Sequence, residues 1–279
     1  MYSRIMGVTA HGYKKYIDSL TRPYKYAELL ASMKAILAED EFNRTYGKRR
    51  MFEKLQLDYD CPYCYNTVAK VMRENGLLQK RNSPKGLTKA EKQAQKSDNL
   101  LKRNFSATAP NQKMVTDITE WTARDGKVYQ SGVFDCFDNA CLGLSFADHM
   151  RTELCVETYS QAARHYDLRG AVSHSDRGSQ YTSEEFRRML AQHGIIQSMN
   201  SAAGRCHDNA KCESMWARGK EEIMALYDTK RMTCQELKSL IFRYYMSYWN
   251  NRRICSAIGG VPPVVKRGAY YEKLADYAA

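Results

Sequence analysis

The chain has 279 residues, of which 43% are hydrophobic, and it carries a formal net charge of +12 at pH 7. This length fits one large or two ordinary domains, and the apolar content is enough for a packed core. No run approaches the roughly 18 apolar residues of a membrane span, and the first residues lack the apolar segment of a signal peptide. We therefore expect a cytoplasmic protein with no membrane partner, and the charge favours nucleic acid as its polyanionic partner.

The first part of the chain is predicted to be helical. Apolar residues recur at helical spacing over residues 24–40, a shorter helix follows over 46–57, and a third helix begins after a turn at 58–62, with Asn66 as its cap. The outward face of this third helix is polar and basic, as in a helix that enters the DNA major groove, although such a helix is often only a solvated surface. We predict a helix-turn-helix region over residues 1–79, in which DNA is contacted by Arg49, Arg50, Lys70 and Arg73.

Nine cysteines, an odd number, favour reduced thiols over a disulfide framework. Cys61 and Cys64 have the spacing of a zinc or redox pair, but no second cysteine or histidine pair follows at the distance of a zinc finger. We expect these two residues to lie in the turn between two helices.

A basic segment at residues 80–103 is predicted to be a partly helical linker. Eight lysines and arginines, beginning with Lys80 and Arg81, stand here against two acidic residues. Such a segment can follow the phosphate backbone of DNA, which would make binding steeply dependent on salt.

The predicted core covers residues 104–232. Three β-rich runs, at 113–122, 127–137 and 142–148, are joined by turn signals and predict consecutive antiparallel strands. Helices and strands then alternate at 153–165, 171–174, 183–194 and 195–199, before the helix that carries Glu213. A long helix over 234–249 begins the last segment, residues 233–279, which we predict to be a helix and tail. This order indicates an α/β fold, with helices on the faces of a mixed sheet.

Three carboxylates stand in different local settings. Asp117 lies inside an apolar strand, Asp176 ends a short strand at a turn, and Glu213 lies on a helix that Asp208 or Asn209 can cap. An unpaired carboxylate inside a strand costs roughly several kcal/mol. Mg²⁺ prefers oxygen ligands, and two such ions roughly 3.5–4 Å apart can clamp an in-line displacement at phosphorus. The three acids together predict a phosphoryl-transfer site.

Neighbouring residues have both structural and chemical interpretations. Taken singly, Asp176 is typical of a turn, and an acid early in a helix favours the positive end of the helix dipole. Lys220 follows Glu213 by seven residues, so it lies on the same helical face and would contact DNA phosphates. His174 and Ser175 resemble a base and a nucleophile, but they lack a Gly-x-Ser-x-Gly elbow, and we expect His174 to help position Asp176.

The segments around the three acids resemble a known family. They read Val115-Thr116-Asp117-Ile118-Thr119, His174-Ser175-Asp176-Arg177-Gly178-Ser179-Gln180-Tyr181-Thr182-Ser183, and Asp208-Asn209-Ala210 through Glu213-Ser214. These motifs are similar to the catalytic core of insertion-sequence transposases, within the D,D,E transposase and retroviral integrase superfamily. Residues 245–253 and the helix-turn-helix segments extend the resemblance over nearly the whole chain, to the second-reading-frame product of these elements.

The resemblance implies a ribonuclease H-like core in which Asp117, Asp176 and Glu213 are the catalytic, metal-binding acids. It implies a DNA transposase of a bacterial insertion element, which cuts at the element ends and joins the freed 3′-hydroxyl to another phosphodiester. Two Mg²⁺ ions per site are implied, with Mn²⁺ as a substitute. The implied partners are the terminal repeats and target DNA, further copies of this chain, and a first-reading-frame helix-turn-helix protein, either separate or fused by a frameshift. Asp135 matches no acid of the family, and we expect it to be structural.

Three departures from the family pattern keep alternatives open. Asp176 and Glu213 are separated by 36 residues where the family usually has 35, Gly219 replaces a usual Leu, and Cys255 replaces a usual His. Glycine costs a helix interior about 1 kcal/mol. The alternatives are a catalytically decayed or repurposed DNA-binding protein, and a metal nuclease that cleaves without joining.

Overall fold

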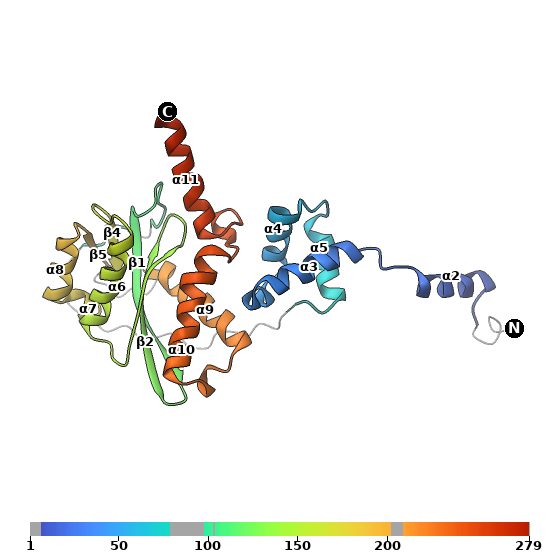
Figure 1. The fold of residues 1–279 in the computed structure, drawn as a ribbon, viewed down its shortest axis with the longest axis horizontal. Helices are drawn as coiled ribbons and strands as arrows, with labels where there is room; N and C mark the ends of the chain where they lie inside the picture. The colour runs from blue at the N-terminus through green and yellow to red at the C-terminus, as the bar shows by residue number, and fades with distance from the viewer. Residues whose placement is uncertain (1–6, 79–97, 103, 202–208, 279) are drawn as a thin grey trace.

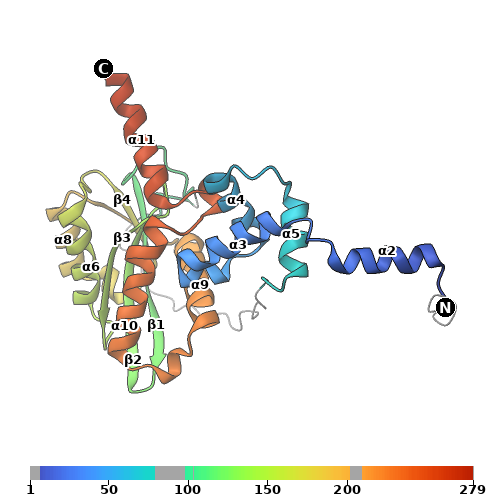
Figure 2. The ribbon, with the colours of Figure 1, turned by 45° about the vertical axis from the view of Figure 1, so that its right-hand side comes forward.

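The computed structural model describes residues 7–78, 98–102, 104–201 and 209–278 (Figure 1). A helical N-terminal part lies beside a mixed α/β core. Helix α2 (Ala10–Thr21) extends away from the N-terminal part, and the end of α11 (Pro263–Ala278) extends away from the core, as Figures 1 and 2 both show. Most of the predicted basic linker, including Lys80 and Arg81, lies outside the described residues.

The N-terminal part contains the three helices that the sequence predicts. They are α3 (Ala27–Glu39), α4 (Lys48–Tyr59) and α5 (Tyr65–Glu74), with the 3₁₀ turn η1 (Glu41–Thr45) after α3. In α5 the apolar residues Val68, Val71 and Met72 are buried, whereas Lys70 and Arg73 are exposed. Helix α5 begins after Cys64, so Asn66 is not its cap. Cys61 and Cys64 lie in the turn between α4 and α5, as expected, and α2 is a helix that the sequence analysis missed.

The core is built on a five-stranded mixed sheet in the order β3-β2-β1-β4-β5. The strands are β1 (Lys113–Ala123), β2 (Gly126–Asp135), β3 (Cys141–Ala147), β4 (Val172–Ser175) and β5 (Ile196–Met199). The first three form an antiparallel meander, and β4 and β5 join β1 in parallel. This is the ribonuclease H-like sheet that the sequence predicts.

Helices cover both faces of this sheet because side chains alternate along β1 and β2. Met114 and Val133 pack with α6 (Thr152–His165) and α8 (Glu184–Gln192) on one face, next to the short helix α7 (Ser179–Thr182). Val115 and Phe134 face the other way, toward α9 (Ala210–Leu226). Gly143 in β3 permits the close approach of α6, since a Cβ there would lie 2.3 Å from the Thr158 carbonyl oxygen.

The C-terminal segment differs in detail from the expected helix and tail. The predicted helix over 234–249 consists of α10 (Cys234–Phe242), which continues as the π-helical segment η4 (Arg243–Trp249). Two 3₁₀ turns, η3 (Thr229–Arg231) and η5 (Ser256–Ile258), flank these helices, and α11 occupies most of the expected tail. The π-helical turn packs four aromatic residues into the core, namely Tyr244, Tyr245, Tyr248 and Trp249.

One apolar cluster joins the N-terminal helices to the core. It runs from Leu29 and Met33 of α3 through Phe42 of η1 to Tyr244 and Tyr248 of η4. The Phe42 ring lies 4.9 Å from the Tyr244 ring and 5.0 Å from the Tyr248 ring, centroid to centroid. The helical part and the core are therefore packed against one another. The predicted domain boundaries at residues 79, 103 and 232 stay predictions.

Across the parts of the chain that the structure describes, every helix is too short or too polar to cross a lipid bilayer.

Candidate active site

Asp117 lies in the middle of β1, on the sheet face that α9 covers. Its partner in the antiparallel register is Gly132 of β2. A Cβ on Gly132 would lie 2.5 Å from the Trp216 ring, so the missing side chain lets Trp216 of α9 rest on the sheet beside Asp117. Trp216 follows Glu213 by three residues, which brings the Glu213 turn of α9 toward the same strand.

Asp176 follows β4 directly, at the end of a strand that runs parallel to β1. Its Oδ1 accepts a hydrogen bond of 2.9 Å from the backbone N–H of Gly178, which closes the turn. His174 is buried, and its ring nitrogens lie 2.8 Å from Ser198 Oγ and 2.9 Å from Asn200 Oδ1. The ring thus ties β4 to β5 just before Asp176, and its role in positioning Asp176 stays a prediction.

Glu213 is exposed in the first turn of α9. Asn209 occupies the N-cap position of this helix, as predicted, but its side chain accepts no hydrogen bond from a backbone N–H of the helix. Its Nδ2 instead donates a 3.1 Å hydrogen bond to the carbonyl oxygen of Thr116, the residue before Asp117. Asp208 lies outside the described residues. Asn209 therefore fixes the start of the Glu213 helix against the Asp117 strand, a contact that no local sequence signal indicates.

The three acids influence one another electrostatically. Burial, together with the negative charges of Asp176 and Glu213, raises the pKa of Asp117 to about 8. The hydrogen bond from the backbone N–H of Ile118 and the positive charge of Lys220 act to lower it. Burial also raises the pKa of Asp176, whereas the hydrogen bond from Gly178 and the charge of His174 act to lower it. Three carboxyl groups on β1, β4 and α9 thus share one region of negative potential.

Lys220 lies on the sheet side of α9, with its Nζ donating a 2.8 Å hydrogen bond to the carbonyl oxygen of Glu120. The ammonium group is also 5.3 Å from the centroid of the Trp121 ring. Burial lowers the pKa of Lys220, while Asp117 and Glu120 act to raise it. Lys220 is thus a cation close to the acids, and its contacts with the Glu120 carbonyl and the Trp121 ring fix it beside β1.

No group of three or more acidic, histidine or cysteine side chains within the described ranges is close enough to hold a metal ion. The chemistry of the donors nevertheless fits a hard divalent cation. Carboxylate oxygens are the ligands that Mg²⁺ prefers, and the raised pKa of Asp117 shows that added positive charge would favour its ionised form.

The predicted DNA contacts on the helix-turn-helix part have different surroundings. The side chain of Arg49 is 70% exposed and pairs with Glu53, and that of Lys70 is 56% exposed and lies 3.8 Å from Glu74. Arg73 is exposed as well. Lys80 and Arg81 lie outside the described residues. These placements leave Arg49, Lys70 and Arg73 accessible to a phosphate backbone.

Arg50 departs from the prediction of a DNA contact. Its side chain is only 13% exposed, and its guanidinium lies 2.9 Å from Glu222 of α9. Glu222 is 4% exposed, and it also accepts hydrogen bonds from Arg253 at 2.6 Å and from Tyr244 at 2.7 Å. Nearby positive charge from Arg253 and Arg50 overcomes the effect of burial and lowers the pKa of Glu222 to about 2. Arg50 therefore links α4 to the core, because charges this deeply buried need partners.

Two of the departures from the family pattern have structural explanations. A Cβ on Gly219 would lie 1.8 Å from the hydroxyl oxygen of Tyr245, so glycine makes room for a buried tyrosine of η4. Cys255 is buried, and its Sγ accepts a 3.4 Å hydrogen bond from Asn139 Nδ2. Between Asp176 and Glu213, where the chain is one residue longer than the family pattern, residues 202–208 lie outside the described residues.

Asp135 is structural, as the sequence predicts. It is buried at the end of β2, where Arg267 of α11 donates to it at 2.5 Å and also binds Asp138 at 2.6 Å. The sequence analysis missed Arg267, because the helix that carries it was expected to be a tail.

Comparisons with known proteins identify the two parts of the chain. The HTH-like domain family matches residues 25–85, and the Integrase core domain family matches residues 107–206. The putative transposase InsK of insertion sequence element IS150 from Escherichia coli K12 is 30% identical over 92% of this chain and 88% of its own. An uncharacterized 31 kDa protein of insertion element IS600 from Shigella sonnei is 28% identical over 98% of this chain and 99% of its own. Among solved structures, the catalytic core domain of BIV integrase matches with a TM-score of 0.44 and 16% identity, over 59% of this chain and 99% of that one.

The matched core and the helix-turn-helix region together define a polynucleotidyl-transferase type of protein with a DNA-binding module. The 30% identity to the IS150 relative extends over most of both chains. The chain belongs to the transposases of insertion sequences.

Proposed function

We propose that this chain catalyses DNA cleavage and strand transfer during transposition of an insertion element, with Asp117, Asp176 and Glu213 as its catalytic acids. The observation that carries the proposal is the convergence of three acids from separate elements. Asp117 lies on β1, Asp176 directly follows the parallel strand β4, and Glu213 lies on α9, whose start Asn209 ties to β1. Burial and the negative charges of the other two acids raise the pKa of Asp117, so a bound cation would stabilise this cluster.

The proposed chemistry has two displacements at phosphorus. In the first, a water oxygen forms a bond to the phosphorus at the element end, the bond to the 3′-oxygen breaks, and the proton lost by water balances the one gained by the 3′-hydroxyl. In the second, that 3′-hydroxyl attacks a phosphodiester of the target, whose own 3′-oxygen leaves. Both displacements use the same acids, because each requires an attacking and a leaving oxygen in line.

Asp117, Asp176 and Glu213 would hold Mg²⁺, or Mn²⁺ as a substitute, with two ions per site as the expectation. The bound ions would offset the negative charge that develops on the oxygens around phosphorus. Asp117 would act from β1 and Asp176 from the turn directly after β4. Glu213 would complete the site from α9, held by the Asn209 contact to Thr116 and by Trp216 on Gly132.

DNA is the proposed partner of both parts of the chain. The net charge of +12 and the exposed Arg49, Lys70 and Arg73 support phosphate contacts by the N-terminal helices. We further propose that more than one copy assembles on the two element ends, that a first-reading-frame helix-turn-helix protein or a frameshift fusion adds to recognition, and that the complex works at the bacterial nucleoid.

A strand-transfer assay tests the proposal. Labelled duplexes that carry the terminal repeats of the element are incubated with the protein and Mg²⁺ or Mn²⁺, and joined products are separated from cleaved ones. Asp117→Asn, Asp176→Asn and Glu213→Gln should abolish both products while leaving DNA binding intact. Glu120→Gln is the matched control, since Glu120 is exposed on the same strand and pairs with Lys127.

Each outcome of this assay points to a different function. Joined product that disappears in the three acid variants supports the transposase. Cleavage without joining identifies a nuclease, and binding without cleavage, also after addition of the first-frame partner, identifies a decayed copy. The fit of Gly219 against Tyr245 argues against decay, because it is a packing adjustment rather than a defect.

A further inference from the structure

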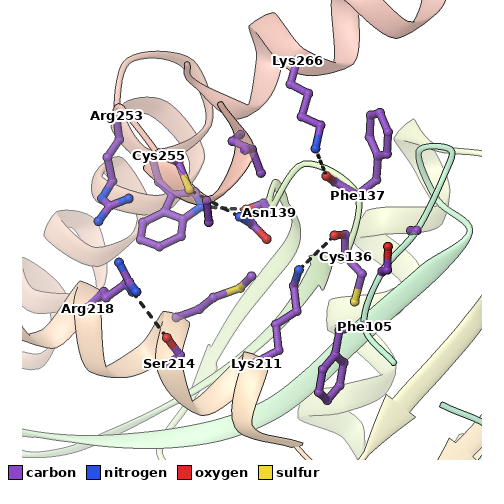
Figure 3. Close-up of a pocket in the computed structure, with 16 residues that line it drawn as sticks. Phe105, Cys136, Phe137, Asn139, Lys211, Ser214, Arg218, Arg253, Cys255 and Lys266 are labelled. Atoms are coloured by element: carbon purple, nitrogen blue, oxygen red, sulfur yellow. Dashed lines mark hydrogen bonds between the residues drawn. The ribbon is translucent and has the colours of Figure 1, made fainter. Parts of the chain in front are cut away.

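A pocket of about 340 Å³ opens beside the first turns of α9 (Figure 3). Its walls come from α9, the turn after β2, the segment before β1 and the residues around η5 and α11. Lys211 and Ser214, which line the pocket, stand on either side of Glu213 in the sequence. A pocket of this volume can take up a small ligand. One wall of the pocket is α9, the helix that also carries the proposed catalytic acid Glu213.

Four cations line the pocket. Arg253 is paired with the buried Glu222, so the positive charge of the pocket comes from Lys211, Lys266 and Arg218. Lys211 Nζ donates to the carbonyl oxygen of Cys136 at 2.9 Å, and Lys266 Nζ donates to that of Phe137 at 2.6 Å, so two ammonium groups meet at consecutive residues of one turn. Arg218 lies on the same face of α9 as Lys211 and Ser214, with its Nε 3.4 Å from Ser214 Oγ. The described residues that line the pocket include no acid. An anion between the cations would reduce their mutual repulsion.

The electrostatics of Lys266 agree with this description. Burial lowers its pKa and the charge of Lys211 lowers it further, whereas Asp138 and Asp135 act in the opposite direction. Both of those acids are already paired with Arg267.

The same pocket has an aromatic wall and a buried acceptor. Phe105 and Phe137 are half-buried. The Phe137 ring contacts both Lys266, at 4.6 Å from its centroid, and the Tyr270 ring. The Phe105 ring meets the His174 ring edge to face at 6.2 Å and carries no cation from the described part of the chain, so Phe105 is the aromatic wall for a base. Asn139 is 7% exposed, and its Oδ1 has no hydrogen-bond partner among the residues that the structure describes. A buried amide oxygen without a donor is costly, and an amino group in the pocket would satisfy it.

We propose that this pocket binds a single unpaired nucleotide of DNA next to the active site. The phosphate lies at Lys211, Lys266 and Arg218, and the base packs against Phe105. An exocyclic amino group of the base donates to Asn139 Oδ1. Adenine, guanine and cytosine carry such a group, whereas thymine can donate only through its ring N3–H, so the pocket favours the amino-bearing bases over thymine. This inference rests on the proposed function and adds to it a site for a nucleotide that has left the duplex.

Binding measurements without divalent ions test the pocket separately from catalysis. Four duplexes share one terminal-repeat sequence and end either blunt or in a three-nucleotide extension of cytidines, thymidines or abasic sites. At one fixed salt concentration, the cytidine extension should bind about tenfold more tightly than the blunt end, because stacking of one base on an aromatic ring has an effect of this order. The thymidine extension should gain less, and the abasic extension least.

Two pocket variants and one control assign the effect to these residues. Phe105→Leu should remove the advantage of the cytidine extension but leave blunt-end affinity unchanged, and Lys266→Gln should weaken binding of every extension. Arg188→Gln on α8, which lies on the opposite sheet face, removes the same charge and should behave like the wild type. Thermal unfolding of each variant reports whether it is folded.

Several results would overturn the inference. Equal affinity of the blunt and cytidine-extended duplexes would refute the pocket while leaving the transposase proposal intact. An advantage that persists in both folded pocket variants would place the unpaired nucleotide elsewhere. Failure to bind any of the four duplexes would contradict both the pocket and the proposed function. Competition by millimolar free dCMP against blunt and extended duplexes alike would identify a general anion site rather than a nucleotide pocket.

Discussion

Replacing Asp117 by asparagine should stabilise the metal-free protein at alkaline pH. Burial and the two neighbouring acids raise the pKa of Asp117 from its ordinary value of 3.8 to about 8. Between these values the folded protein binds a proton that the unfolded chain has lost, so the free energy of unfolding falls as pH rises and levels off above about pH 8. The amide side chain of the Asp117→Asn variant keeps the acceptor for the Ile118 N–H but has no charge to bury.

The size of this effect follows from the rise in pKa. At 1.36 kcal/mol per pKa unit, the full rise corresponds to about 5–6 kcal/mol. Asp117 is only half-buried, and solvent screens part of the interaction, so we expect about 3 kcal/mol at pH 8 and almost none near pH 4. In a chain of this size that gain raises the unfolding temperature by roughly 6–10 °C.

Urea unfolding in EDTA at a series of pH values provides the measurement. The free energies of the wild type and of Asp117→Asn should coincide near pH 4 and diverge up to pH 8. Glu120→Gln should not stabilise the protein, since Lys127 lowers the pKa of that exposed acid. Mg²⁺ should then stabilise the wild type more than the variant. Equal pH profiles for the wild type and Asp117→Asn would refute the electrostatic account of the site.

Three further substitutions test the packing around the acids. Gly132→Ala should push Trp216 and the Glu213 turn away from β1, lowering strand transfer about 10- to 100-fold with DNA binding unchanged, and normal transfer would show that α9 tolerates the shift. Gly219→Ala should destabilise the fold by about 1–3 kcal/mol in urea unfolding despite alanine's better helix propensity, and Tyr245→Phe should recover part of the loss by removing the clashing hydroxyl. Glu222→Gln should cost about 3–5 kcal/mol at pH 7, since it leaves Arg253 and Arg50 buried without a countercharge, whereas the exposed neighbour Glu221→Gln should cost little. The depressed pKa of Glu222 adds a pH test, because its contribution is complete above about pH 4.5 and should be lost as pH falls toward 2.

The sequence predicted the sheet well because its signals are local. Alternation along β1 and β2, with a turn between them, fixes two strands and the face on which Asp117 lies. The end of β4 at Asp176 follows from a short apolar run that meets a glycine turn. Family resemblance then selected these acids from the other carboxylates of the chain.

Contacts between distant segments could not be predicted in the same way. Arg50 has the exposed, basic appearance of a DNA contact until Glu222, far along the chain, is packed against it. Gly219 looks like a helix defect until Tyr245 occupies the space beside it. Lys211, Ser214 and Arg218 look like ordinary polar residues of a helix until Lys266 and Asn139 lie across the pocket from them. In each case the deciding partner is set by tertiary packing rather than by local propensity.

The Arg50–Glu222 contact bears on how recognition and chemistry are connected. Arg50 belongs to the first helix of the helix-turn-helix pair, and Glu222 belongs to α9, which also carries Glu213. Separating these buried charges leaves each without a partner, at a cost of about 3–5 kcal/mol. The aromatic contacts of Phe42 with Tyr244 and Tyr248 oppose the same separation. This interface therefore opposes separation of the helix-turn-helix helices from the core that carries Glu213.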